Sequence, residues 1–167
     1  MGGSWEVADF ENRFPKSSIS AGAVRLGFAR SYLEASDMSL KTPQVIPYLY
    51  YDDVPGAIAF LTTAFGFSER MRAGTPRGGM HAEIALGDQI VMLGQGAAEK
   101  HHKSPREAGL STAGVFIYLD DVDAHFALAR DAEADIVEPL KDLSYGRSYT
   151  ARDPEGHSWF FTAPQVV

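Results

Sequence analysis

The sequence predicts an α+β fold in which two βαβββ modules in tandem form a curved mixed sheet around a cleft, with the helices on the outer face. An internal repeat carries this prediction. The segment "YYDDVPGAIAFL" begins at Tyr50, and "YLDDVDAHFALA" begins 68 residues later at Tyr118. With the same offset, "HAEIALGDQIVML" falls on "YTARDPEGHSWFF", and each predicts a polar-apolar strand, a tight turn and a strongly apolar strand. One offset that holds for both matches indicates a duplication.

The first module is expected to begin with a strand at Val45–Tyr51, which is rich in β-branched and aromatic residues. Asp53 is placed to cap a helix and Gly66 to end it. The apolar residues between them recur at the spacing of one buried helical stripe, namely Val54, Ile58, Leu61 and Phe65. Three strands follow, near Phe67–Arg72, Met80–Leu86 and Gln89–Gly94, the last two joined by the two-residue turn Gly87-Asp88.

The second module repeats this order. A strand at Val115–Leu119 precedes a helix from Asp121 to about Ala132. The expected strands are Asp135–Leu140, Arg147–Arg152 and Ser158–Thr162, and "DPEG" supplies the last hairpin turn, with Pro154 and Glu155 central. We therefore expect one domain over residues 43–167, with modules at about 43–96 and 112–164.

The first 42 residues differ from the rest, because they show no clean period and no apolar run of the signal-peptide kind. We interpret them as an extension, disordered or belonging to an upstream start, with a short helix around Val24–Ala35. Strand-like patterning begins only after Met38.

Composition excludes several classes of function. A net charge of −7 argues against nucleic-acid binding, which requires a basic face. The chain has no cysteine, which excludes disulfides, thiolate zinc sites and cysteine nucleophiles. No apolar run approaches the roughly 20 residues of a membrane span. We expect a cytoplasmic protein without membrane partners.

Four segments together resemble the vicinal-oxygen-chelate superfamily, which includes glyoxalase I, bleomycin-resistance proteins and extradiol dioxygenases. They are "IPYLYYDDVPGAIAFLTTAFGF", "MHAEIALGDQIVMLG", "DDVDAHFALARDAEADIVEPLKDLSYGRSY" and "ARDPEGHSWFF". The chain looks most like the bacterial PhnB-like or bleomycin-resistance-like branch. The resemblance covers about Thr42 to Pro164 and implies a homodimer.

In metal-using members of that superfamily, each module gives one ligand from its first strand and one from its last. The resemblance puts these positions at Ile46, Met92, Gly114 and Phe160, and none of the four is an oxygen or imidazole ligand. A shift of two residues would bring Gln44 into the first position. No Asp or Glu follows Glu155, so the last strand has no carboxylate in any register. No metal and no other cofactor is expected.

Side chains alternate across a strand, so the face that carries positions 46 and 114 should carry a set of aromatic and polar residues. His81 and Glu83 share this face through their pairing across the Gly87-Asp88 hairpin, and their repeat counterparts are Tyr149 and Ala151. The predicted ligand-binding residues are Tyr48, Tyr50, His81, Glu83, Met92, Phe116, Tyr118, Arg147 and Tyr149. Together they predict an aromatic pocket for a small molecule.

Each of these residues also has a structural interpretation. The Tyr and Phe side chains could be core or dimer interface, His81 and Glu83 a hydrogen-bonded structural pair, and Arg147 a cover for the cleft rim. His101 and His102 are expected on the surface, and His157 in a structural role. Asp52, Asp53, Asp120 and Asp121 are expected to cap helices.

Three functions remain open. The first is a metal-free protein that sequesters an aromatic or cationic small molecule, as the bleomycin-resistance resemblance implies. The second is a lyase, isomerase or dioxygenase that uses His81 and Glu83 as a displaced metal site or an acid–base pair. The third is a dimerisation or regulatory module whose cavity is filled by its own side chains, such as Met92, Phe116 and Phe160.

Overall fold

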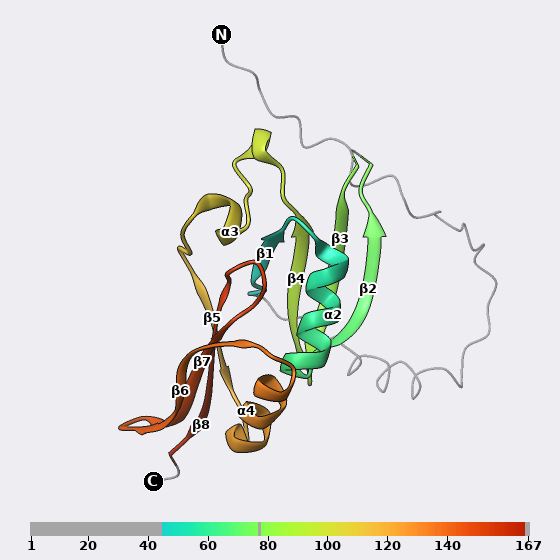
Figure 1. Ribbon diagram of the computed structural model, residues 1–167. Helices are drawn as coiled ribbons and strands as arrows, with labels where there is room; N and C mark the ends of the chain where they lie inside the picture. The colour runs from blue at the N-terminus through green and yellow to red at the C-terminus, as the bar shows by residue number, and fades with distance from the viewer. Residues whose placement is uncertain (1–44, 77, 166–167) are drawn as a thin grey trace, which may run out of the picture. The chain divides into compact units, whose positions relative to one another are not determined.

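The computed structural model describes residues 45–76 and 78–165 (Figure 1). The predicted extension and its short helix lie outside these residues. The first module contains β1 (Tyr48–Tyr51), α2 (Val54–Phe65), β2 (Ser68–Gly74), β3 (Met80–Leu86) and β4 (Gln89–Gln95). A connecting segment carries η2 (Ala98–Lys100) and α3 (Pro105–Ala108). The second module contains β5 (Gly114–Tyr118), α4 (Val122–Asp131), β6 (Asp135–Leu143), β7 (Gly146–Arg152) and β8 (Ser158–Pro164).

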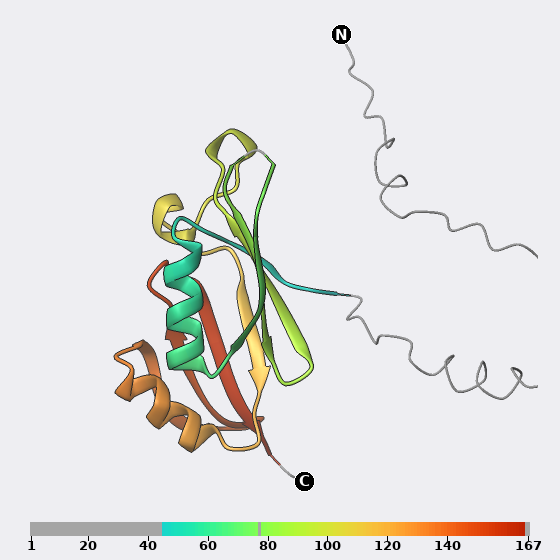
Figure 2. The ribbon, with the colours of Figure 1, turned by 90° about the vertical axis from the view of Figure 1, so that its right-hand side faces the viewer.

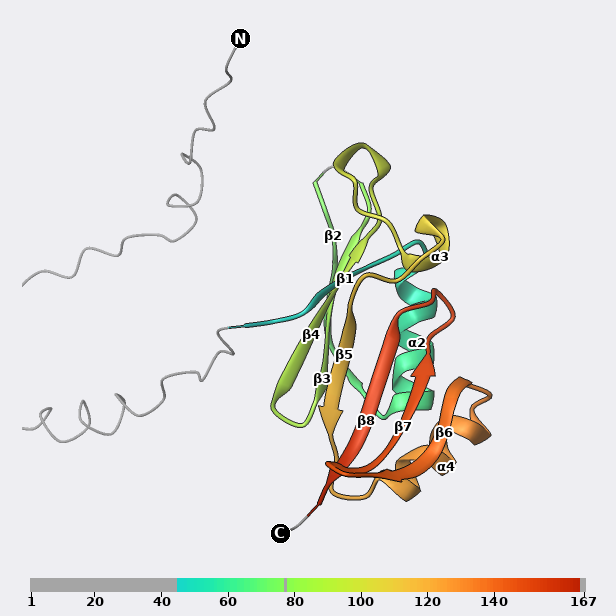
Figure 3. The ribbon, with the colours of Figure 1, turned by 90° about the vertical axis from the view of Figure 1, so that its left-hand side faces the viewer.

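The predicted tandem βαβββ architecture is confirmed, with the strands in two four-stranded sheets that do not close. The strand orders are β1-β4-β3-β2 and β5-β8-β7-β6, so each first strand pairs in parallel with the last strand of its module. Figures 2 and 3 show α2 and α4 on the same side of both sheets. Every helix within the described residues is too short or too polar to traverse a lipid bilayer.

The helix boundaries follow from local chemistry. The Asp53 side chain accepts the Gly56 N–H at 3.0 Å, and α2 ends at Gly66 in the left-handed conformation, which glycine adopts without a Cβ penalty. The Asp121 side chain caps α4 in the same way, by accepting the Ala124 N–H at 2.9 Å. Both aspartates therefore have the predicted capping role, whereas the Asp52 carboxylate accepts a hydrogen bond from Ser104 instead.

One continuous core lies under the helices and joins the two modules. The predicted stripe of α2 is buried throughout, at Val54, Ile58, Leu61 and Phe65. The Phe65 ring packs against Trp159 and Phe161 of β8, with ring centroids 5.7 and 5.0 Å apart. Full burial of such side chains contributes roughly 1.5–3 kcal/mol each, so these contacts fix the modules against each other.

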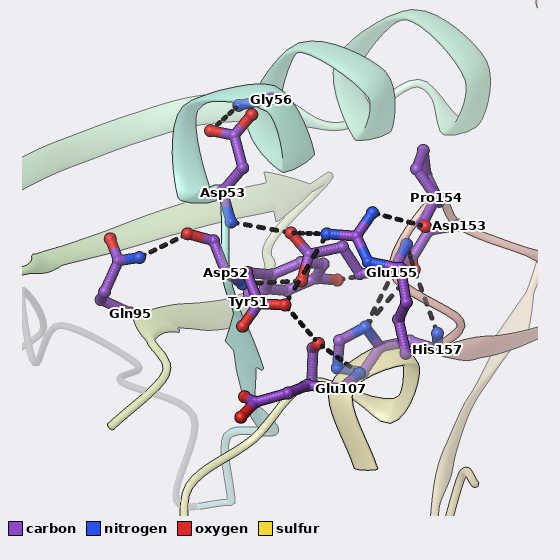
Figure 4. A network of polar contacts seen from close by, with 12 residues as sticks. Tyr51, Asp52, Asp53, Gly56, Gln95, Glu107, Asp153, Pro154, Glu155 and His157 are labelled. Carbon is purple, nitrogen blue, oxygen red and sulfur yellow. Dashed lines mark hydrogen bonds and ion pairs between the residues drawn. The ribbon is translucent and has the colours of Figure 1, made fainter. Parts of the chain in front are cut away.

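The "DPEG" turn joins the two modules through hydrogen bonds of its carboxylates (Figure 4). The Glu155 carboxylate accepts the backbone N–H groups of Asp52 and Asp53, at 2.6 and 2.8 Å, just before α2. Asp153 accepts hydrogen bonds from the Tyr51 hydroxyl at 2.8 Å and the Trp159 indole at 3.0 Å. Both carboxylates are almost fully buried and belong to the second module, so the start of the first helix depends on a turn about a hundred residues away.

Candidate ligand-binding site

The sheet faces that point away from α2 and α4, here called the open face, carry most of the predicted ligand-binding residues. In the first module, β1 and β4 pair Tyr48 with Met92 and Tyr50 with Gly94. Strands β3 and β4 pair Glu83 with the same methionine and His81 with the same glycine. The register therefore brings five predicted residues together in two adjacent rows, as the sequence indicated.

The polar groups of this module lie around Tyr48. Its hydroxyl and the Nδ1 atom of His81 share a hydrogen bond of 3.0 Å, and its ring lies 5.2 Å from that of Tyr50. Burial, together with the neighbouring Tyr50, raises the pKa of Tyr48. The ring also covers Gly94, because a Cβ atom there would lie only 2.5 Å from Tyr48 Cε1. His81 thus pairs with a tyrosine and not with Glu83.

In the second module β5 and β8 bring aromatic side chains to the open face, beside Thr162 and, on β7, Ser148 and Thr150. Phe116 of β5 pairs with Phe160 of β8, and their rings stack at 6.2 Å. Phe116 is 47% exposed, Tyr118 66% and Tyr145 52%, which is high for side chains of this size. The rings of Phe116 and Tyr145 lie 6.4 Å apart. These residues form an apolar surface that lacks a covering layer within the described part of the chain.

Two predicted residues are on the wrong face. Tyr149 pairs with Phe161, is 1% exposed, and its hydroxyl lies 2.6 Å from Nδ1 of His125 in α4. Burial raises the pKa of Tyr149, and burial lowers the pKa of His125 although its bond to the Phe65 carbonyl opposes this. The Arg147 guanidinium binds Asp123 of α4 at 2.9 Å, and that bond raises its pKa. The prediction that Tyr149 and Arg147 point into the cleft is therefore wrong.

The error comes from the length of one turn. Leu86 pairs with Gln89 across two residues, whereas Arg152 pairs with Ser158 across five. A constant offset of 68 places β7 one residue out of register, and a shift of one residue moves every side chain to the opposite face. The positions that correspond to His81 and Glu83 are Ser148 and Thr150, which pair with Thr162 and Phe160.

The side chains at the superfamily's metal positions do not fit a metal ion. Gly114 has no side chain, and the Phe160 ring occupies the space above it, since a Cβ atom at 114 would lie 2.5 Å from Phe160 Cε2. Ile46 is apolar and Met92 offers only a thioether. No group of three His, Asp or Glu residues able to hold a metal ion occurs within residues 45–76 and 78–165.

Sequence reasoning missed His102. Its ring stacks on Tyr50 at 4.1 Å, and two backbone hydrogen bonds to Ala97 hold it there. It lines a pocket of about 360 Å³ with Tyr48, Tyr50, Gln95 and Lys100. A loop residue carries no periodicity, so nothing in the sequence pattern distinguished His102 from the exposed His101.

Comparison with known proteins agrees with this architecture. The sequence matches the Glyoxalase/Bleomycin resistance protein/Dioxygenase superfamily over residues 43–161. The chain belongs to this superfamily. An uncharacterized protein of Mycobacterium tuberculosis strain H37Rv is 32% identical over 152 residues, which cover 87% of this chain and 89% of that protein.

Several solved structures superpose on the chain. TioX from Micromonospora sp. ML1 is 33% identical, with a TM-score of 0.56 over 72% of this chain and 98% of TioX. TnmS3, an antibiotic binding protein from Streptomyces sp. CB03234, is 18% identical, with a TM-score of 0.57 over 72% of this chain and 96% of TnmS3. FosX, a fosfomycin resistance protein from Listeria monocytogenes, is 15% identical, with a TM-score of 0.58 over 73% of this chain and 93% of FosX. The last two similarities concern the fold alone.

Proposed function

We propose that the protein binds a small aromatic or cationic molecule on its open face and holds it without a metal ion. The observation that carries this proposal is a pair of stacked, partly exposed rings, Phe160 and its strand partner Phe116. Phe160 stands at one of the positions where the superfamily resemblance puts a metal ligand. An exposed aromatic surface gains free energy when a planar molecule stacks on it. Sequestration needs no further chemistry.

Charge on the first module supports a cationic guest. Glu83 lies in the same row as Tyr48 and Met92, and no ion pair links it to another described residue. A carboxylate beside tyrosine rings attracts a cation both by its charge and through cation–π contacts. TnmS3, which shares the fold, is an antibiotic binding protein, and this supports capture of a small molecule as the general activity.

We also propose that the protein acts as a homodimer in the cytoplasm of a bacterium. Tyr118 and Phe116 are largely exposed, and a second copy that packed on the open face would bury them. The pairing of two open faces would enclose the guest between aromatic walls. Light scattering of the purified protein at several concentrations measures this association.

The proposal is tested with 9-aminoacridine, a planar fluorescent cation, as the probe. Binding should quench its fluorescence, and Phe116→Ala should weaken the affinity about tenfold because one stacking surface is lost. Glu83→Gln should weaken it about threefold by removing the negative charge. Leu128→Ala serves as the control, since Leu128 is 44% exposed on α4 and far from the open face. Equal affinities for all four proteins would contradict the proposal.

Metal analysis separates binding from the enzyme alternative. The purified, untagged protein is examined by mass spectrometry for bound metal, and its melting temperature is followed with added Mn, Fe, Co, Ni and Zn. We expect no stoichiometric metal and no stabilisation. Bound metal that His81→Ala removes would instead indicate a lyase, isomerase or dioxygenase with a relocated site.

A further inference from the structure

One ring of the open face is already covered by a side chain of the protein itself. Tyr50 belongs to the row that pairs it with Gly94 and His81. The His102 ring, from the loop that follows η2 (Figure 1), lies 4.1 Å from the Tyr50 ring between centroids, and the two planes differ by only 18°. The imidazole therefore occupies a position where an aromatic guest would stack on Tyr50.

The backbone that carries His102 is anchored beside β1. The Ala97 N–H donates to the His102 carbonyl at 2.8 Å, and the His102 N–H donates to the Ala97 carbonyl at 3.1 Å. At the start of the same loop, the Gly96 N–H donates to the Tyr51 carbonyl at 2.8 Å. These bonds involve main-chain atoms alone, so the His102 side chain can change rotamer while its backbone stays in place.

The His102 ring itself has no such anchor. Within residues 45–76 and 78–165, no hydrogen bond joins its ring nitrogens to another residue, whereas the rings of His81, His125 and His157 each have a polar partner. One aromatic pair changes an equilibrium constant only a few-fold. A rotation of the His102 side chain therefore uncovers Tyr50 without breaking a hydrogen bond between described residues.

Space for a larger ring system lies beside this pair. Both Tyr50 and His102 line the pocket of about 360 Å³ described above, together with Tyr48, whose ring lies 5.2 Å from that of Tyr50. Glu99 and Lys100 also line it, and their formal charges cancel. A single small ring could only replace the imidazole, whereas a fused ring system would extend from Tyr50 into the pocket and bury more apolar area.

We propose that His102 is an internal competitor for the guest, and that the guest is a flat molecule with fused aromatic rings. The guest ring takes the place of the imidazole on Tyr50, and the His102 side chain rotates away. The competition lowers the affinity of every guest by the same factor, so only guests with a large stacking area still bind tightly. This inference rests on the proposed function, because it concerns the same open face.

Substitutions of His102 test the competition, with 9-aminoacridine as the probe and titration calorimetry as the measurement. His102→Ala should tighten binding about fourfold, because no aromatic pair has to be broken. His102→Phe should weaken it about threefold, since a phenyl ring stacks on Tyr50 more extensively than an imidazole. Unchanged or weaker binding to His102→Ala would overturn the proposal. Tighter binding to both variants would also overturn it, because loss of the imidazole and not of stacking would then be the cause.

The neighbouring histidine provides the matched control. His101 is exposed and does not line the 360 Å³ pocket. Its backbone has φ 59°, a left-handed conformation that Asn tolerates, so His101→Asn removes an imidazole and keeps the loop. This variant should bind 9-aminoacridine as the wild type does. A gain equal to that of His102→Ala would disprove a specific role of His102.

A double-mutant cycle shows whether the effect of His102 passes through Tyr50. Tyr50→Leu keeps an apolar side chain but removes the ring on which both the imidazole and the guest stack. In that background, His102→Ala should leave the affinity unchanged, because the competition no longer exists. The same fourfold gain with and without Tyr50 would contradict the proposal.

Two cations of different ring size test the class of guest. 4-Aminopyridine has a single ring, whereas 9-aminoacridine has three fused rings, and the wild type should bind the larger cation at least about tenfold more tightly. His102→Ala should strengthen the binding of both by the same factor, since the imidazole is displaced in either case. Equal affinity of the wild type for the two cations would rule out the proposed class of guest.

The outcomes separate this inference from the proposed function. If no variant binds 9-aminoacridine, both are wrong. If the probe binds and Phe116→Ala weakens it, but His102→Ala brings no gain, the proposed function stands and the competition is disproved. A gain in His102→Ala without a loss in Phe116→Ala would support the competition at Tyr50 and contradict the role given to Phe116.

Discussion

The two modules share one topology, yet they bury their helices to different degrees. Helix α2 buries six of its residues, from Val54 to Phe65, whereas α4 buries only Val122 and Ala129. Leu61 and Ala129, which correspond in the repeat, are both fully buried, so the smaller side chain holds α4 with less apolar area. The comparison shows that a duplicated pattern can keep the path of the chain while the stabilising contacts concentrate in one copy.

The hairpin turns differ in the same manner. Gly87 and Asp88 form a short exposed turn, whereas the loop from Asp153 to His157 buries its three polar side chains, and Glu155 binds the start of α2. The longer loop changes the register of β7 and so exchanges the faces of Tyr149 and Thr150. This turn of the second module thus holds the two modules together. It also determines which side chains of β7 lie on the open face.

The largest effect should come from the helix that carries the core. Leu61→Ala should lower the free energy of unfolding by about 3 kcal/mol, because it removes a fully buried side chain and leaves a cavity. Leu128→Ala in α4 should change it by less than about 0.5 kcal/mol, since Leu128 is 44% exposed. Urea denaturation measures both. Similar losses in the two variants would contradict the asymmetry between the modules.

A smaller difference in the free energy of unfolding should distinguish the Asp153–His157 loop from the Gly87-Asp88 turn. Asp153→Asn should lower the free energy of unfolding by about 2 kcal/mol at pH 7, because three side-chain donors and two backbone N–H groups lose a charged acceptor. Asp88→Asn in the exposed turn should cost almost nothing.

The pH dependence of this difference has a definite sign. The pKa of Asp153 is lowered in the folded protein, so its stabilisation is complete above the unfolded value of about 3.9 and is lost as pH falls through the folded value. The melting temperatures of wild type and Asp153→Asn should therefore converge below about pH 4. A constant difference down to the most acidic pH would show that the charge of Asp153 is unimportant.

The smallest effect should distinguish the two tyrosines that the sequence placed together. Tyr149→Phe should lower the free energy of unfolding by about 1 kcal/mol through loss of the buried bond to His125, and it should leave 9-aminoacridine affinity unchanged. Tyr48→Phe should change stability by less than about 0.5 kcal/mol, since Tyr48 is 42% exposed. Weaker binding of 9-aminoacridine by Tyr149→Phe would contradict the placement of Tyr149 outside the binding site.

Most of the architecture was predictable because it depends on residues that lie close together in the sequence. The helix from Val54 to Phe65 and the strand Met80–Leu86 have the expected bounds, since apolar spacing and capping residues act within a few positions. Strand β1 starts at Tyr48 instead of Val45, and β6 extends to Leu143. In the first module, the residues of the open face were predictable because the two-residue turn Gly87-Asp88 sets the register between β3 and β4.

The sequence by itself determined the order of the elements, the duplication and the helix caps, because each depends on neighbours along the chain. Only the tertiary structure decided that Thr150 and not Tyr149 lies on the open face, because the register of β7 depends on how the loop before β8 closes. It also decided that Glu155 binds the start of α2 and that His102 stacks on Tyr50. These contacts join residues far apart in sequence, where no periodic pattern relates one partner to the other.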